Sequence, residues 1–233
     1  MEDKKNVKLI VIVAVICVLL IGGTFAALMF SANITNGNIQ GCTTSFAITY
    51  GVSDSGNEEP ITGTLFPSKK AQGGLSGKVS LTMVRDNACD ASITGIGTLK
   101  LHMNGNNSNS ADLLKNITTG HCEDTTTFET LSDYTTSSAC TASSSRKWVT
   151  STTGLKYAIY TNSAGTGTPV SAGYIPSGDF STGYDITIYD EFTIDYTTRV
   201  YYVFVWLDGY ITDNSYVNLP VSAYITASAV QSE

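Results

Sequence analysis

The chain has 233 residues, 14% of them charged, and its formal net charge is −7. Beyond the first eight residues it carries ten Lys and Arg against eighteen Asp and Glu. This acidic balance disfavours nucleic-acid binding, because a phosphate backbone would be repelled. Abundant Thr, Ser, Gly, Asn and Tyr are typical of an extracellular β-domain rather than a helical cytosolic enzyme, and the length suits one large domain.

An apolar segment without charged residues runs from Leu9 to Phe30, directly after a cluster of three lysines. At about 1.5 Å per residue, a helix of this length spans a hydrocarbon core of about 30 Å. The lysines favour a cytoplasmic N-terminus and direct the rest of the chain outward. We therefore interpret residues 1–30 as a signal peptide or a single-pass transmembrane anchor.

Two interpretations of this segment remain open. In the first it is a cleaved signal peptide, because Gly22 and Gly23 break the helix and Thr24 and Ala26 supply small residues at positions −3 and −1. Cleavage between Ala26 and Ala27 would then release the mature chain. In the second, the whole apolar segment is retained as an anchor.

A short polar connector, residues 31–41, is expected before a β-rich domain that covers residues 42–233. Segments with strand-like alternation or β-rich composition recur, separated by Gly, Asn, Asp, Ser and Pro clusters. The segment 200–207 is apolar on both faces and predicts a central strand covered on both sides. The full set of predicted strands is 45–50, 78–85, 98–103, 155–161, 184–189, 191–196, 200–207 and 221–230.

One part of the domain does not follow the strand pattern, and we interpret residues 104–147, approximately, as an insertion. Residues 111–117 are compatible with one or two helical turns. Residues 118–145 are rich in Thr and Ser and poor in large apolar side chains, which predicts a long surface excursion. Eight or so strands without a long amphipathic helix favour a β-sandwich.

Five cysteines occur, and Cys17 lies within the apolar segment, where it acts as a small hydrophobe. The other four, an even number in an exported domain, predict disulfides. Three pairings are possible, and proximity in the chain favours Cys42–Cys89 and Cys122–Cys140. A zinc site is the alternative, but the paired spacing that zinc ligands usually show is missing, so we expect no metal.

No catalytic motif is recognisable in the sequence. Metalloprotease, nucleophile-elbow and phosphate-loop patterns are all missing. Of the two histidines, His102 belongs to an alternating segment and is expected to face solvent, while His121 adjoins Cys122, which is a weak signal for a metal site. We expect no enzymatic activity and no cofactor.

Two groups of acidic residues near the C-terminal strands could supply oxygen ligands for calcium. The groups are Asp190, Glu191 and Asp195, and Asp208 and Asp213. Their spacing does not match an EF-hand loop, so solvated turn carboxylates are the simpler interpretation. In the same way, the aromatic side chains of segment 200–207 could form a ligand platform, but strand spacing indicates that they are core residues.

Several of these features together resemble a known group of exported proteins. The lysine cluster, the apolar run and the block from Ile21 to Ala27 resemble the export signals of the camelysin and TasA group of Gram-positive bacteria. Cys42–Phe46, Val79–Cys89, Val205–Asp208 and Ile225–Gln231 are similar to segments of uncharacterised exported Firmicutes proteins. The resemblance covers about half of the chain.

The resemblance implies a surface or biofilm-matrix protein with a jelly-roll-like sandwich, in some members assembled into fibres by strand donation. Camelysin has been called a metalloprotease, but this sequence has no zinc-protease motif, and that activity is not transferred. We expect a non-enzymatic structural protein, either membrane-anchored with an extracellular domain or secreted to the cell surface. Residues 27–40 are its candidate donor strand for self-association. A surface adhesin or carbohydrate-binding module is the alternative.

Overall fold

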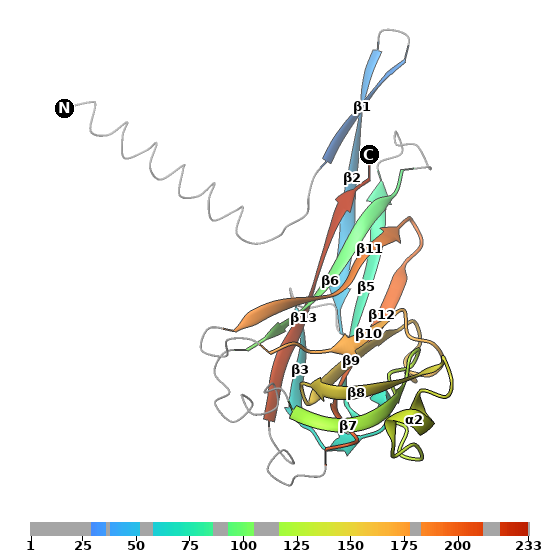
Figure 1. Ribbon diagram of the computed structural model, residues 1–233. Helices are drawn as coiled ribbons and strands as arrows, with labels where there is room; N and C mark the ends of the chain where they lie inside the picture. The colour runs from blue at the N-terminus through green and yellow to red at the C-terminus, as the bar shows by residue number, and fades with distance from the viewer. Residues whose placement is uncertain are drawn as a thin grey trace, which may run out of the picture.

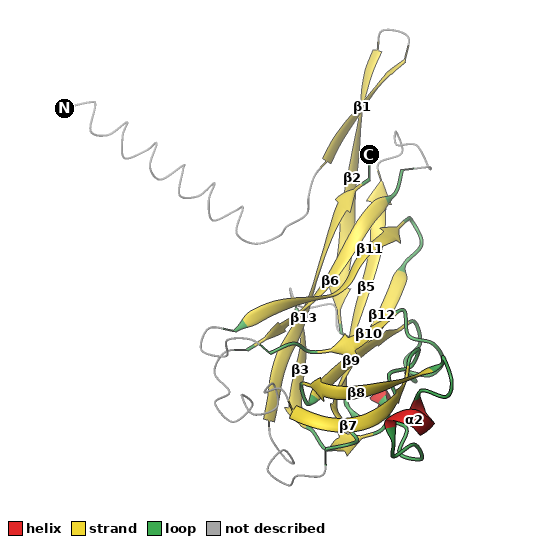
Figure 2. Cartoon of the chain, in the orientation of Figure 1, coloured by secondary structure: helices red, strands yellow, loops and turns green. Residues whose placement is uncertain are grey.

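The computed structural model describes residues 29–35, 38–51, 58–85, 93–104, 117–177, 183–211 and 220–232. Most of them lie in strands, and their helical structure is limited to two short turns (Figure 2). In chain order the elements are β1 (Met29–Thr35), β2 (Asn38–Tyr50), β3 (Glu59–Thr64), β4 (Pro67–Ser68), η1 (Ala71–Gly73), β5 (Leu75–Arg85), β6 (Gly95–Met103), β7 (Ile117–Asp124), α2 (Ser137–Cys140), β8 (Arg146–Thr152), β9 (Leu155–Tyr160), β10 (Ser171–Tyr174), β11 (Tyr184–Ile194), β12 (Arg199–Asp208) and β13 (Pro220–Gln231).

Two sheets form the body of the molecule, and a smaller third sheet lies at one end (Figure 1). The larger sheet has the order β1-β2-β5-β12-β9-β10 and is antiparallel, except that β4 runs parallel to the end of β12. The second sheet has the order β11-β6-β13-β3. The third is the hairpin of β7 and β8, with α2 beside it.

A single hydrophobic cluster joins the two large sheets. Period-2 alternation produces it, because every second side chain of a strand points to the same face. In β6, Leu99, Leu101 and Met103 are buried, and in β12 Val203 and Val205 lie in the same cluster. Phe204 and Trp206 point the other way into a second buried cluster, so β12 is covered on both faces. The sequence predicted this for segment 200–207.

The prediction of an all-β domain is confirmed, and strands cover the core of every segment for which one was predicted. Two details differ. Segments 184–189 and 191–196 were predicted as separate pieces, but β11 runs through both, with register shifts near Glu191, whose φ is 54°. Strands β1, β3, β4, β7, β8 and β10 were not predicted, because they lack a clear apolar alternation.

The prediction of a surface excursion for residues 118–145 is wrong in its first part. Most of β7 occupies this segment, and His121, Cys122 and Glu123 are buried. The alternation there is real, but the inward-facing side chains are polar, so a search for apolar periodicity misses it.

The N-terminal part of the described chain forms a hairpin that extends beyond the sandwich (Figure 1). Strand β1 pairs with residues 38–44 of β2, whereas residues 44–50 of β2 pair with β5. The connector predicted at residues 31–41 therefore lies largely in this hairpin. In the described residues no helix is both long and apolar enough to cross a membrane, and residues 9–28 of the predicted apolar segment lie outside them.

Candidate functional site

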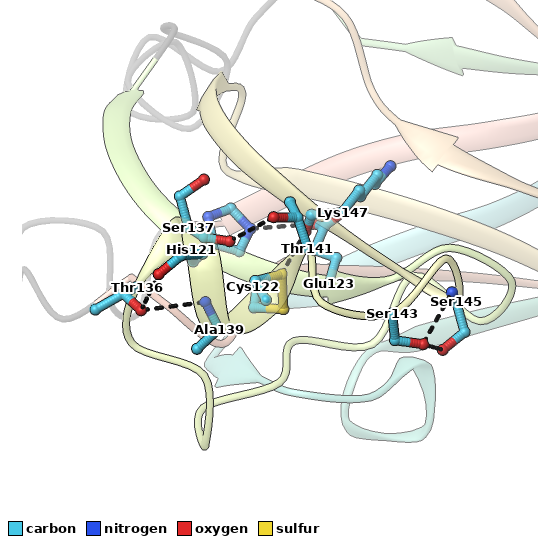
Figure 3. Close-up of a disulfide and its surroundings, with 12 residues drawn as sticks. His121, Cys122, Glu123, Thr136, Ser137, Ala139, Thr141, Ser143, Ser145 and Lys147 are labelled. Carbon is cyan, nitrogen blue, oxygen red and sulfur yellow. Dashed lines mark hydrogen bonds and ion pairs between the residues drawn. A yellow bond between two sulfur atoms is a disulfide. The ribbon is translucent and has the colours of Figure 1, made fainter.

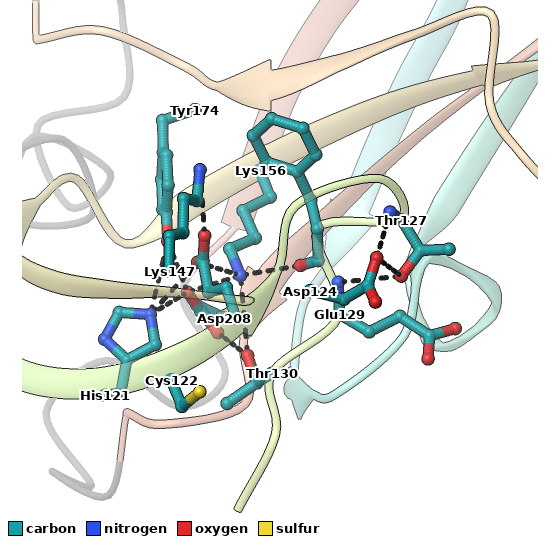
Figure 4. Close-up of polar contacts among 12 residues, drawn as sticks. His121, Cys122, Asp124, Thr127, Glu129, Thr130, Lys147, Lys156, Tyr174 and Asp208 are labelled. Carbon is teal, nitrogen blue, oxygen red and sulfur yellow. Dashed lines mark hydrogen bonds and ion pairs between the residues drawn. The ribbon is translucent and has the colours of Figure 1, made fainter. Parts of the chain in front are cut away.

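A cluster of buried ionisable side chains lies where the β7–β8 hairpin meets the larger sheet (Figure 4). At its centre is Lys156, whose Nζ lies 2.6 Å from Glu123 Oε1 and 2.8 Å from Asp208 Oδ2. All three side chains are fully buried. His121 completes the cluster, with Nε2 3.0 Å from Glu123 Oε1 and 3.4 Å from Asp208 Oδ2. Two carboxylates thus share one buried ammonium group.

Strand geometry explains how these residues converge. Lys156 is the second residue of β9 and pairs with Trp206 of β12, so Asp208, two residues further along β12, projects on the same face of the sheet as Lys156. The backbone N–H of Asp208 donates to Gly154 O at 2.9 Å, which keeps the two strands together at this end. The pairing of β9 with β12 therefore fixes the Lys156–Asp208 contact.

The hairpin delivers the other half of the cluster. His121 and Glu123 are two residues apart in β7 and point inward together, while Cys122 between them points away. Cys122 forms a disulfide with Cys140 at the end of α2, with a Cα–Cα distance of 5.6 Å (Figure 3). The disulfide fastens β7 beside the position from which Glu123 projects.

The loop after β7 supplies further hydrogen bonds. Thr130 Oγ1 donates to Asp208 Oδ1, and Lys156 Nζ donates to Phe128 O at 2.9 Å. The loop is itself ordered by Asp124, whose Oδ1 accepts from two backbone N–H groups of the turn that follows. The ordered loop therefore fixes the Phe128 carbonyl and the Thr130 hydroxyl in positions facing the cluster.

Two side chains close the cluster on its outer side. Tyr174 of β10 donates from its hydroxyl to Asp208 Oδ2 at 3.2 Å. Lys147 of β8 places its Nζ 3.2 Å from Glu123 Oε2, and its side chain is 38% exposed. His121 is stacked on Tyr210, with 3.8 Å between ring centroids. Water has little access to the central atoms.

Burial and hydrogen bonding act in opposite directions on the cluster. Burial raises the pKa of Asp208 and of Glu123, but contacts with His121 and Lys156 lower it by more, so each carboxyl has a pKa below its ordinary value. Burial lowers the pKa of His121, yet its hydrogen bonds with Asp208 and Glu123 raise it, and the net direction is upward. The carboxyl groups are thus ionised at neutral pH.

Three of these residues could in principle hold a metal ion, since one ligand atom each of His121, Glu123 and Asp208 lies within 4.8 Å of the others. The donor set does not fit that role in this arrangement. The Lys156 ammonium already contacts both carboxylates, and a divalent ion placed between them would face a positive charge at contact distance. Lys156 takes the place that a cation would need.

The other residues singled out in the sequence do not join this cluster. His102 lies in β6, between β11 and β13 of the second sheet, with Nδ1 2.6 Å from Asp185 Oδ1 and its ring stacked on Tyr224. Asp195 pairs with Arg199 at 2.7 Å. Asp208 belongs to the buried cluster instead of a solvated turn, so that interpretation was wrong for it.

The Cys122–Cys140 disulfide is the pairing that proximity in the chain favoured. The predicted pair Cys42–Cys89 and the predicted cleavage site at Ala26–Ala27 lie outside the residues whose side chains the structure describes. Asp213 lies outside them as well.

Comparison with known proteins gives no match: no family model, no curated protein and no solved structure is similar to this chain. The arrangement of side chains must therefore carry the functional argument.

Sequence reasoning missed the cluster as a whole. Glu123, Lys156 and Thr130 had no place in any motif, because their sequence spacing is irregular, Glu123 and Lys156 lie in different sheets, and Thr130 lies in a loop. One signal was present: Lys156 follows Leu155 in a segment that is otherwise apolar or aromatic, and a lysine in a strand buried on both faces needs a buried partner.

Proposed function

We propose that the protein is a non-enzymatic structural protein of the cell surface or extracellular matrix. It would be exported through its N-terminal segment, built on a jelly-roll-like sandwich and capable of self-association. The Cys122–Cys140 disulfide supports an oxidising exterior, because such bonds persist mainly outside the cytoplasm. The central polar cluster supports a structural role, because its groups are buried beneath the hairpin and turned toward one another.

The observation that carries self-association is the staggered pairing of β2. Residues 38–43 pair with β1 and residues 45–50 pair with β5, so within the described chain each stretch has a ladder partner on one side only. Unpaired N–H and C=O groups along a strand edge are a template for a strand from another chain. A second copy of the β1 segment, part of residues 27–40, is the occupant that we propose.

Electron microscopy and sedimentation velocity of the processed protein at high concentration test this proposal. Fibres or discrete oligomers are expected for the natural chain. Ser31→Pro, in the middle of β1, removes a ladder N–H and should leave monomers. Ser163→Pro is the matched control, because Ser163 follows Asn162 in an exposed turn closed by the Gly165 N–H to Asn162 O hydrogen bond, where proline is tolerated. A natural chain that stays monomeric contradicts the proposal.

A second candidate, a surface adhesin that binds glycans, is favoured by one open pocket. Tyr189, Tyr201 and Arg199 line it together with Thr161 and Thr198. The Tyr189 ring beside hydroxyl and guanidinium donors suits a sugar ring, whereas Tyr201 is buried in the core beneath it. A glycan array probed with the natural protein and with Arg199→Ala would support this candidate only if binding is seen and the substitution removes it.

A further inference from the structure

The position of Lys156 goes beyond an ion pair. Its Nζ is 2.8 Å from Asp208 Oδ2, and because Cγ is one bond from that oxygen, the nitrogen lies close to the ~3–3.5 Å separation at which reacting atoms are held before attack. We propose that Lys156 and Asp208 condense into an intramolecular amide that links β9 covalently to β12, with Glu123 as the proton carrier.

The reaction balances without any added reagent. A proton passes from the Lys156 ammonium to the Asp208 carboxylate, which leaves a neutral amine beside a carboxylic acid. The Nζ lone pair attacks Cγ, the C–N bond forms, and Glu123 takes a second proton from the nitrogen. The C–O bond then breaks, and that proton leaves with the hydroxyl as water. One ammonium and one carboxylate become one amide and one water, and Glu123 returns to its initial state.

Glu123 is placed for this role. Its Oε1 lies 2.6 Å from Lys156 Nζ, within the range that direct proton transfer requires. His121 Nε2 contacts the same oxygen at 3.0 Å, and Lys147 Nζ lies 3.2 Å from Oε2, so the carboxylate is held on both sides. It faces the attacking nitrogen in a fixed orientation.

The Asp208 carboxyl group is equally well prepared. Thr130 donates to Oδ1 and Tyr174 donates to Oδ2 at 3.2 Å. Preorganised donors at these oxygens stabilise the negative charge that develops on them when the carbon becomes tetrahedral. They polarise the carbonyl toward attack in the same way. After condensation, one donor can remain on the amide oxygen.

Burial supplies the thermodynamic reason. Lys156, Glu123 and Asp208 are all fully buried, and a buried ion pair retains a large desolvation cost even when its geometry is good. An amide carries no charge, so condensation removes one positive and one negative charge from the site. Exclusion of bulk water also disfavours the reverse hydrolysis. The reaction leaves Glu123 with Lys147 and His121 as its cationic or hydrogen-bonding partners.

The proposed amide lies where it would resist mechanical separation of two strands. Lys156 and Asp208 lie on neighbouring antiparallel strands of the larger sheet, and the amide would close the chain from residue 156 to residue 208. The Cys122–Cys140 disulfide fastens the hairpin that covers the same site. Two covalent links of different chemistry would then secure one end of the sandwich.

Tryptic peptide mapping of the natural full-length protein tests the proposal. Trypsin does not cleave after an acylated lysine, so the amide should yield residues 148–199 joined to residues 200–233, at the summed mass less one water. Without the bond, peptides 148–156, 157–199 and 200–233 appear separately, and this result overturns the proposal. None of the N-x-Ser/Thr sequons lies in these peptides, so glycosylation at them does not obscure the masses.

The map also distinguishes the amide from a common alternative. Asp208 is followed by Gly209, and an Asp-Gly step can lose one water by closing a succinimide on its own backbone. The succinimide gives the same intact mass but leaves Lys156 cleavable and the peptides unlinked. Loss of water without linkage therefore counts against the proposal.

Two variants and a control test the roles of Asp208 and Glu123 in amide formation. Asp208→Ala should give no linked peptide, and Glu123→Gln, which keeps the shape but cannot carry the proton, should reduce the linked fraction at least tenfold. Lys70→Met is the control, because its exposed side chain pairs with Glu129 at 3.6 Å, outside the cluster, and this variant should keep the linkage. Full linkage in Glu123→Gln would overturn the role given to Glu123.

Discussion

Lys156 and Glu123 meet at 2.6 Å, Nζ to Oε1, although they belong to strands of different sheets. Lys156 comes from β9 of the large sheet and Glu123 from β7 of the hairpin. The contact therefore depends on the docking of the hairpin against the sandwich. Substitutions at this interface should therefore disturb both the cluster and the docking of the hairpin.

Removal of the central cation should be strongly destabilising. Lys156→Met leaves two buried carboxylates without a cation and also removes the proposed amide, so we expect the free energy of unfolding to fall by at least about 3–5 kcal/mol. Urea denaturation at neutral pH measures the loss. Lys70→Met is the control, since its side chain is 64% exposed in the Lys70–Glu129 pair and a surface pair of this kind contributes at most ~1 kcal/mol. If the free energy of unfolding fell equally in the two variants, the buried Lys156 charge would be no more important than a surface charge.

While Asp208 is a free carboxylate, the pKa of His121 should lie above its ordinary value of 6.5, because the contacts with Asp208 and Glu123 outweigh the effect of burial. A raised folded pKa gives stability that is fully present below 6.5 and is lost as the pH rises through the folded pKa. The natural protein should therefore lose its advantage over His121→Gln on the alkaline side. Proton NMR can follow this titration directly, because the chain has two histidines and His102→Gln assigns the other signal. A midpoint at or below 6.5 contradicts the prediction.

The disulfide should contribute to stability and to the geometry of the cluster. Cys122 and Cys140 are 18 residues apart, and closing a loop of this size is worth about 3 kcal/mol. The double variant Cys122→Ser, Cys140→Ser should lose that amount in chemical denaturation and should form the Lys156–Asp208 amide more slowly, because Glu123 is held less firmly. A double variant is preferable to a reductant, which would act on any other disulfide too. An unchanged denaturation midpoint would show that the disulfide does not stabilise the folded protein.

Processing at the N-terminus can be checked separately from the fold. Edman sequencing of protein released from the cell surface should begin at Ala27, because Thr24 and Ala26 supply small side chains before the cut. Ala26→Phe should block cleavage and leave the chain membrane-associated. A natural surface protein whose sequence begins at Met1 would instead support a retained anchor.

The sequence by itself determined the all-β class and most strands of the two large sheets. Apolar alternation encodes which face of a strand meets the core. Leu99 and Leu101 in β6 can be recognised in this way without coordinates. The same reasoning gave β12 as a strand buried on both sides. Chain proximity among the cysteines was enough to favour Cys122–Cys140.

Only the tertiary structure decided that His121, Glu123, Lys156 and Asp208 form one buried cluster. Contacts between β7, β9 and β12 depend on how the hairpin docks, and no sequence period records the meeting of residues 33 or more positions apart in different sheets. Polar side chains on the inward face of β7 resemble a solvated loop until their partners are known. Pairing with an opposite charge at hydrogen-bonding distance offsets part of the cost of burying each charge, and that complementarity exists only in the folded chain.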